Sequence, residues 1–165
     1  MRTRLVRGSV ALLAMAGASL GLVAAPVTAG ADNMPMPKVA ASVVVLKGAN
    51  ENPPADPDGS AIFAYAAFGN HLCYVLFDAD NLDTVIAAHI HAGAVGVNGP
   101  IVVMLKTPTP VGKECIMAVP DTTPNSTSVL TQSELNAIIA NPDQFYANVH
   151  TTVFPAGAVR AQLRR

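Results

Sequence analysis

Residues 60–77 read SAIFAYAAFGNHLCYVLF, and this stretch predicts a β-hairpin. Ser60–Phe68 is an apolar run with interspersed aromatic residues, and His71–Phe77 is a second run of the same kind. Gly69-Asn70 between them is a two-residue turn signal of the type that joins antiparallel strands. Because strands joined by so short a turn pair antiparallel, we expect the fold to be built on an antiparallel sheet.

Further apolar segments flank this hairpin, and turn residues separate them. On the N-terminal side, the β-branched segment Ser42–Leu46 is followed by Asn52–Gly59, which contains three prolines and a Pro-Asp-Gly turn. On the C-terminal side lie Thr84–His91 and Ile101–Leu105, with a glycine-containing loop at Gly93–Pro100 between them. Each of the three apolar segments has the length and composition of a β-strand.

The C-terminal part of the chain predicts one helix and two more strands. Residues 107–128 are rich in Thr, Pro, Ser and Asn, and we expect a long surface connection there. Thr131 and Glu134 have the spacing of a capping box, and Asn141-Pro142 ends the helix that it opens. The last two strands are expected at Phe145–Thr151 and Ala158–Leu163. About seven short strands and one short helix indicate an all-β fold, an antiparallel β-sandwich of the immunoglobulin-like or Cu/Zn-dismutase-like kind.

The N-terminal residues have the pattern of a targeting signal. Three arginines in the first seven residues precede the apolar run Val10–Ala25, and Ala29-Gly30-Ala31 offers an A-x-A cleavage site. We therefore expect a secretory signal peptide over residues 1–31, a flexible leader over 32–41 and a single domain over 42–165. The chain would then be secreted, periplasmic or otherwise extracellular, with no membrane span after removal of the signal.

The composition of the expected mature chain excludes some classes of partner. Without residues 1–31 it has seven basic and eleven acidic residues, which gives a formal charge of −4 with histidine neutral. This balance argues against nucleic-acid binding, which needs a basic surface. The chain has no Trp and few other aromatic residues, so base stacking and aromatic carbohydrate platforms have little support.

The two cysteines, Cys73 and Cys115, are an even number in a chain with an export signal, and we expect them to form a disulfide. The bond would close a loop of about 42 residues, worth about 4 kcal/mol in the chain-entropy model. A redox-active or metal-binding thiol pair is the alternative, but the spacing is not that of a C-x-x-C motif.

Three histidines form the candidate site. His89 and His91 are two residues apart in a predicted strand, so their side chains share a face with Cα atoms about 6.5–7 Å apart. Asn148 and His150 share a face of a later strand in the same way. If the two strands are neighbours, His150 completes a three-histidine set suited to copper or zinc. The alternative is that these side chains only hold nearby loops by hydrogen bonds.

Arg160, in the last predicted strand, is a further candidate. Its guanidinium group would either bind an anion or pair with a carboxylate such as that of Glu51. A buried Arg–Glu pair would tie the two ends of the sandwich together.

Together, several segments resemble the CHRD domain, which was first described in chordin and is found in many exported bacterial proteins. The matching motifs are Leu46–Pro54, Ala87–Gly93 with Asn98-Gly99-Pro100, Tyr146–Thr151, and Phe154-Pro155 with Arg160–Leu163. The resemblance covers roughly residues 42–163. This chain departs from the family pattern at Ala158, where an acidic residue is usual, and at Ala161, where glycine is usual.

The resemblance implies an extracellular β-sandwich module with no established general catalytic activity. The first hypothesis is therefore a secreted, non-catalytic binding or structural module with an unidentified extracellular ligand. The second is an exported copper- or zinc-binding protein that uses His89, His91 and His150. The third is a dismutase-like oxidoreductase, although the four histidines of the chain are few for such a site.

Overall fold

The structure is a computed structural model that describes residues 38–165. The expected signal peptide and most of the expected leader lie outside the described residues. The first strand begins at Val39, three residues before the expected start of the domain. Residues 39–41, which the sequence analysis assigned to the leader, pair with residues 66–68 of the next strand. None of the helices in the described part of the chain has the length and hydropathy needed to cross a membrane.

In the described residues, eight strands form one antiparallel sheet in the order β5-β4-β7-β8-β1-β2-β3-β6. Their bounds are β1 Val39–Lys47, β2 Ser60–Phe68, β3 His71–Asp80, β4 Val85–Ala92, β5 Ile101–Leu105, β6 Gly112–Met117, β7 Phe145–Thr151 and β8 Val159–Gln162. Strands β2, β5 and β7 have the expected bounds. The sheet folds over on itself, so the predicted all-β sandwich class is confirmed.

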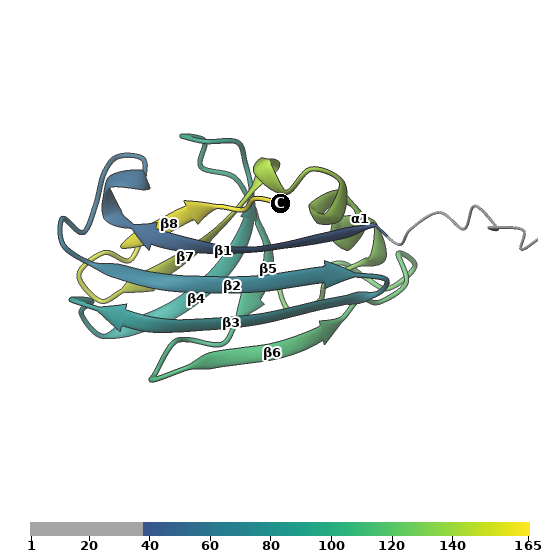
Figure 1. The fold of residues 1–165 in the computed structure, drawn as a ribbon, viewed down its shortest axis with the longest axis horizontal. Coiled ribbons are helices and arrows are strands. Elements are labelled where there is room, and N and C mark those ends of the chain that lie inside the picture. The colour runs from purple at the N-terminus through teal and green to yellow at the C-terminus, as the bar shows by residue number, and fades with distance from the viewer. Residues whose placement is uncertain (1–37) are drawn as a thin grey trace, which may run out of the picture. The chain divides into compact units, whose positions relative to one another are not determined.

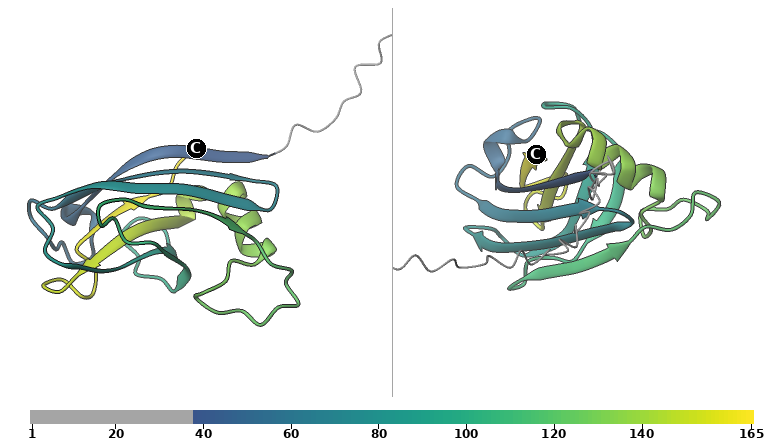
Figure 2. Two further views of the ribbon diagram at one scale, coloured as in Figure 1. Left: turned by 90° about the horizontal axis from the view of Figure 1, so that it is seen from below. Right: turned by 45° about the vertical axis from the view of Figure 1, so that its right-hand side comes forward.

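The sheet forms two layers around the hydrophobic core. Strands β1, β2, β3 and β6 make one layer, and β4, β5, β7 and β8 lie behind it (Figure 1; Figure 2, left). The layers are continuous through β8 and β1, which share a single register pair, Lys47 with Arg160. Phe63 from the first layer and Ile90 and Val149 from the second are fully buried in the common core.

The hairpin at residues 60–77 is confirmed. Strands β2 and β3 pair up to Phe68 and His71, next to the turn. Gly69 in the turn has φ +56°, a left-handed conformation that glycine adopts without a steric cost. The expected helix is also present as α1 (Gln132–Ala140), with Thr131 and Glu134 forming the capping box.

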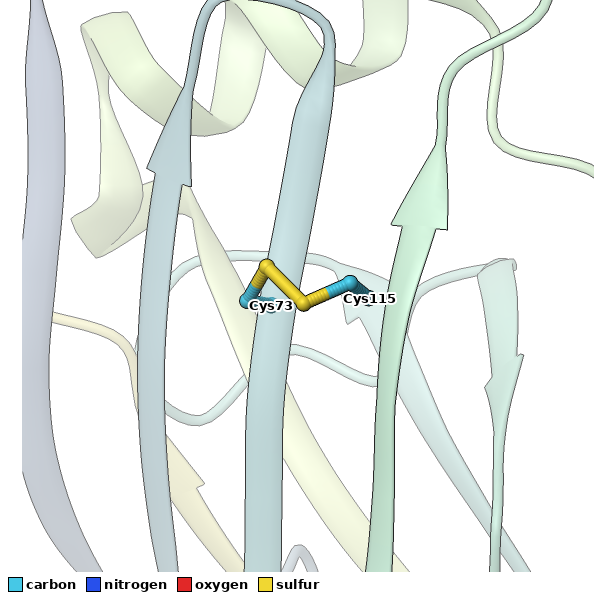
Figure 3. Close-up of a disulfide and its surroundings, with 2 residues drawn as sticks. All are labelled: Cys73 and Cys115. Atoms are coloured by element: carbon cyan, nitrogen blue, oxygen red, sulfur yellow. A yellow bond between two sulfur atoms is a disulfide. The ribbon is translucent and has the colours of Figure 1, made fainter.

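Strand β6 lies within residues 107–128, where the sequence predicted only a long surface connection. Its sequence, GKECIM, has little β-pattern of its own, but it pairs with β3 over six register positions. Cys73 and Cys115 are directly opposite each other in this pairing and form a disulfide (Figure 3). The predicted disulfide is thus confirmed, and pairing with a neighbouring strand makes β6 a strand where local sequence alone does not.

Candidate metal centre

The pairing of β4 with β7 brings the three histidines to one face of the sheet. His89 on β4 lies opposite Asn148 on β7. His150, two residues farther along β7, lies opposite Ala87. Ile90 and Val149 point to the opposite face and are fully buried in the core. Side chains alternate along a strand, so the histidines occupy the outer face of their layer. Loops cover that face and leave each histidine less than a tenth exposed.

The three imidazoles face a common point. His89 Nδ1 lies 3.0 Å from His150 Nε2, and each histidine offers a ring nitrogen within 4.8 Å of the other two. An ion bound tetrahedrally at about 2.0–2.1 Å from each nitrogen requires nitrogens about 3.3 Å apart. Small rotations of the rings would therefore bring all three within bonding distance of one ion.

Backbone carbonyls fix the tautomers of two of the histidines. His91 Nδ1 lies 2.9 Å from the carbonyl oxygen of Gly99, and His150 Nδ1 lies 3.0 Å from that of Pro155. A carbonyl only accepts, so both Nδ1 atoms carry the proton. In the neutral rings the Nε2 atoms then carry lone pairs, and His150 Nε2 accepts from His89 Nδ1. His91 Nε2 is buried and has no hydrogen-bond partner within residues 38–165.

Burial keeps these rings neutral. Burial, together with the smaller effects of the neighbouring His150 and His91, lowers the pKa of His89 to about 4. Burial is also the main reason why the pKa values of His91 and His150 lie below the usual range. Neutral imidazole is the form that binds metal ions. His91 and His150 therefore present Nε2 lone pairs near pH 7, whereas His89 could bind an ion through Nδ1 only in its other neutral tautomer, with the proton on Nε2.

The loop at residues 93–99 holds His91 in place. Gly99, which supplies the carbonyl for His91, donates its own N–H to the hydroxyl of Tyr146 at 3.2 Å. The ring of Tyr146 stacks on that of His91, with centroids 4.9 Å apart and planes 7° apart. A Cβ atom at residue 99 would lie only 1.5 Å from the carbonyl oxygen of Ala92, so only glycine fits there. Sequence reasoning did not assign Tyr146 to the site, although alternation along β7 places it on the same face as Asn148 and His150.

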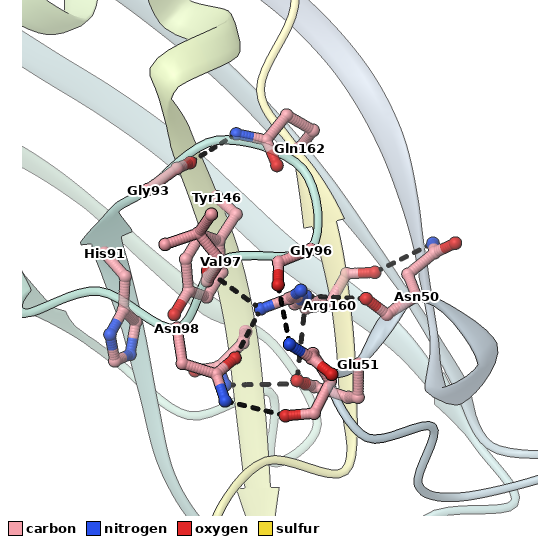
Figure 4. Close-up of polar contacts among 12 residues, drawn as sticks. Asn50, Glu51, His91, Gly93, Gly96, Val97, Asn98, Tyr146, Arg160 and Gln162 are labelled. Atoms are coloured by element: carbon pink, nitrogen blue, oxygen red, sulfur yellow. Dashed lines mark hydrogen bonds and ion pairs between the residues drawn. The ribbon is translucent and has the colours of Figure 1, made fainter.

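Arg160 lies beside the centre and ties its surrounding loops together (Figure 4). Its Nε donates to the carbonyl oxygen of Asn50 at 2.6 Å. Its Nη1 donates to the Val97 carbonyl at 3.3 Å and to Oδ1 of Asn98 at 3.0 Å. The guanidinium group also lies over the Tyr146 ring, 4.6 Å from the centroid. These contacts connect the loop at residues 93–99 with the segment after β1.

Glu51 is the acidic partner in this cluster. Its Oε2 lies 3.8 Å from Arg160 Nε, and both side chains are almost entirely buried. Its Oε1 accepts a hydrogen bond of 3.5 Å from Asn148 Nδ2. Burial raises the pKa of Glu51, while the positive charge of Arg160 and the bond from Asn148 oppose the rise. The structure therefore places Glu51, Asn148 and Arg160 in one cluster next to the histidines.

Comparison with protein-family models gives one match, to the CHRD domain, over residues 42–163. The matched range includes seven of the eight strands in full and all but the first three residues of β1. It also includes the three histidines and the cluster of Glu51, Asn148 and Arg160. Comparisons with curated proteins and with solved structures each gave no significant match.

Proposed function

This chain belongs to the CHRD domain family, and from that premise we propose that it is an exported binding module for a transition-metal ion. The ligands are His89, His91 and His150, and the ion is zinc or copper. Imidazole nitrogen suits both of these metals, whereas calcium and magnesium prefer oxygen ligands. Three protein ligands leave a fourth position for water or another small ligand.

One observation carries the proposal, namely the lone pair on His91 Nε2. This atom is buried without a partner, although the same ring is firmly oriented through Nδ1 and the Gly99 carbonyl. Metal-binding histidines commonly have this arrangement, in which one nitrogen donates to a carbonyl and the other faces the ion. A bound cation would satisfy this lone pair, and its contacts with His89 and His150 would replace the hydrogen bond between those two rings.

A structural role for the same histidines is the competing function. It is favoured by the hydrogen bonds from His91 to Gly99 and from His150 to Pro155, which hold two loops. This role accounts for the Nδ1 atoms but leaves His91 Nε2 unexplained. In the structural case, His89→Ala would lower the free energy of unfolding equally with and without metal. In the metal-binding case, the variant would mainly remove the stabilisation that metal confers.

Calorimetric titration of chelator-treated protein with Zn(II) and Cu(II) tests the proposal. We expect close to one ion per chain with micromolar or tighter affinity, and loss of that binding in His91→Ala. His71→Ala is the matched control, because His71 lies at the β2–β3 turn and is not part of the cluster. The proposal fails if the protein shows no saturable micromolar binding, or if His91→Ala binds as tightly as the parent.

Export is part of the proposal. The disulfide supports it, because such bonds persist mainly in oxidising compartments outside the cytosol. We expect the full chain, expressed in a bacterial host, to appear in the periplasm or medium with its N-terminus near Asp32. Recovery of the uncleaved chain in the cytosol alone would contradict export without bearing on metal binding.

A further inference from the structure

The layer formed by β1, β2, β3 and β6 is apolar on both of its faces. Its inner face lies in the core, where Phe63 is fully buried. On β1 the side chains that point the other way are Val39, Ala41, Val43 and Val45. Antiparallel sheets that have one solvated face usually alternate apolar and polar residues along each strand. Strand β1 does not follow this pattern before Lys47.

The apolar positions continue from β1 across the whole layer. The partners of its four outward residues on β2 are Phe68, Ala66, Ala64 and Ile62. The same register leads to Cys73, Val75 and Phe77 on β3 and to Cys115 and Met117 on β6. His71 and Lys113 complete the set, and Lys113 is its only lysine, arginine or carboxylate. We call these residues the outer face.

The outer face is open to solvent. No helix, strand or loop within residues 38–165 lies over it (Figure 1; Figure 2, left). Val43 on β1 and Met117 on β6 are 65% and 63% exposed. A contiguous apolar surface of this kind is rare on soluble monomers and indicates that a partner covers it.

The size of the outer face matches the requirement of a weak dimer. Its residues form four rows across four strands. With strands about 4.8 Å apart and rows about 6.8 Å apart, they cover roughly 500 Å². Two copies packed on this face would bury about 1,000 Å² in total, which is the lower limit for a specific interface.

The relief of the outer face is complementary to itself. The two middle rows line a groove of about 750 Å³, because they contain small residues such as Ala41, Ala64 and Ala66. Phe68 and Met117 stand in the row beside this groove. When two copies meet about a two-fold axis that crosses the strands, these larger side chains of each copy lie over the small middle rows of the other.

The distribution of charge also favours a second copy. The expected mature chain has a formal charge of −4, which opposes contact between most parts of two copies. The outer face contributes only the charge of Lys113, which lies on the edge strand β6, so two copies can meet there without the burial of a central charge. A single lysine gives little attraction for anionic lipid, so a membrane surface is a poorer occupant.

We propose that the chain forms a two-fold symmetric dimer through the outer face of β1, β2, β3 and β6. The sheets of the two copies pack face to face, as the two layers of a sandwich do. The histidines lie on β4 and β7 in the other layer, so each copy keeps its proposed metal centre outside the interface.

Sedimentation equilibrium of the purified protein in a metal chelator tests the proposal, from low micromolar to submillimolar concentration. We expect a reversible equilibrium between monomer and dimer with a dissociation constant in the micromolar range. A monomer at every concentration would overturn the proposal, whatever else covers the face. A dimer that forms only after zinc is added would arise from the histidines and would overturn it as well. Neither result would affect the proposed metal centre.

Three variants locate the interface. Val43→Lys and Met117→Lys each place an ammonium group in the apolar contact and should weaken dimerisation by at least about tenfold. Val153→Lys is the matched control, because Val153 is 58% exposed but lies between β7 and β8. All three should keep the urea midpoint of the parent in its monomeric state, because the replaced side chains are exposed. Parent-like dimerisation in both Val43→Lys and Met117→Lys, or an equal loss in Val153→Lys, would overturn the proposal.

Discussion

At the scale of single residues, Gly99 determines how His91 is oriented. Its carbonyl accepts the His91 Nδ1 proton, and its Cα lies so close to Ala92 that no side chain fits. Gly99, eight residues after His91 in the sequence, thereby controls which nitrogen of the His91 ring faces the centre. The prediction from alternate histidines in a strand named the proposed ligands, but it contained no information about this contact.

Replacement of Gly99 by alanine should weaken metal binding. The new methyl group displaces the backbone and with it the carbonyl that fixes His91, and loss of such an orienting contact typically costs 10–100-fold in affinity. Competition of zinc between the protein and a chromogenic chelator measures the change. Gly69→Ala is the control, because its φ of +56° also disfavours a side chain, but Gly69 lies in the β2–β3 turn. Equal losses in the two variants would contradict the role given to Gly99.

At the scale of elements, the loop at residues 93–99 is held against the segment after β1 by reciprocal amide contacts. Asn98 Nδ2 donates to the Asn52 carbonyl, and Asn52 Nδ2 donates to the Gly96 carbonyl, both at 2.6 Å. Asn98 also accepts from Arg160. Because this loop covers His91, its attachment should govern how fast an ion leaves.

Asn98→Ala should speed metal release more than it changes the fold. The variant removes the contacts to Asn52 and Arg160 and loosens the loop, while the ligands and the sheet remain. Stopped-flow mixing of the zinc-loaded protein with excess chelator measures the release rate, and we expect a several-fold increase. Asn125→Ala is the control, because Asn125 is exposed and bonds only to Glu134. An unchanged rate in Asn98→Ala would show that the loop does not limit release.

The local sequence pattern predicted those elements whose own residues favour the conformation that they adopt in the fold. The β2–β3 hairpin and β7 followed from apolar runs and turns, and α1 followed from its capping box. Strand β6 did not, because its polar, partly exposed sequence is extended only through pairing with β3. In the site, alternation predicted which histidines share a face. The neighbouring positions of β4 and β7 and the carbonyl partners depend on tertiary structure that no local pattern encodes.

At the scale of the whole molecule, the disulfide stabilises the layer opposite the histidines. It joins β3 to β6, the edge strand of the sheet, and closes a loop with a sequence separation of 42. The Cys73→Ser/Cys115→Ser double variant should lose about 2–4 kcal/mol of unfolding free energy, measured by urea denaturation. Its zinc affinity should match that of the parent, because the histidines lie on β4 and β7. A large loss of affinity in the folded variant would contradict this separation.

The metal-free protein should lose stability as the pH falls from about 6.5 to about 4. The pKa of His89 is lowered to about 4 in the folded chain, and those of His91 and His150 are also lowered. The unfolded chain therefore binds more protons across this window, which favours unfolding as the pH falls. Urea midpoints measured in chelator at a series of pH values test this. Replacement of all three histidines by glutamine should flatten the dependence, whereas the same slope in that variant would contradict the assignment.

The central claim is that three imidazoles meet at one ion, and X-ray absorption spectroscopy of the zinc-loaded protein tests it most directly. We predict a first shell with three imidazole nitrogens at about 2.0–2.1 Å, visible through the outer-shell scattering of the rings. The triple glutamine variant should lack this signature. A first shell of oxygen alone, or imidazole scattering that persists in the variant, would contradict the account.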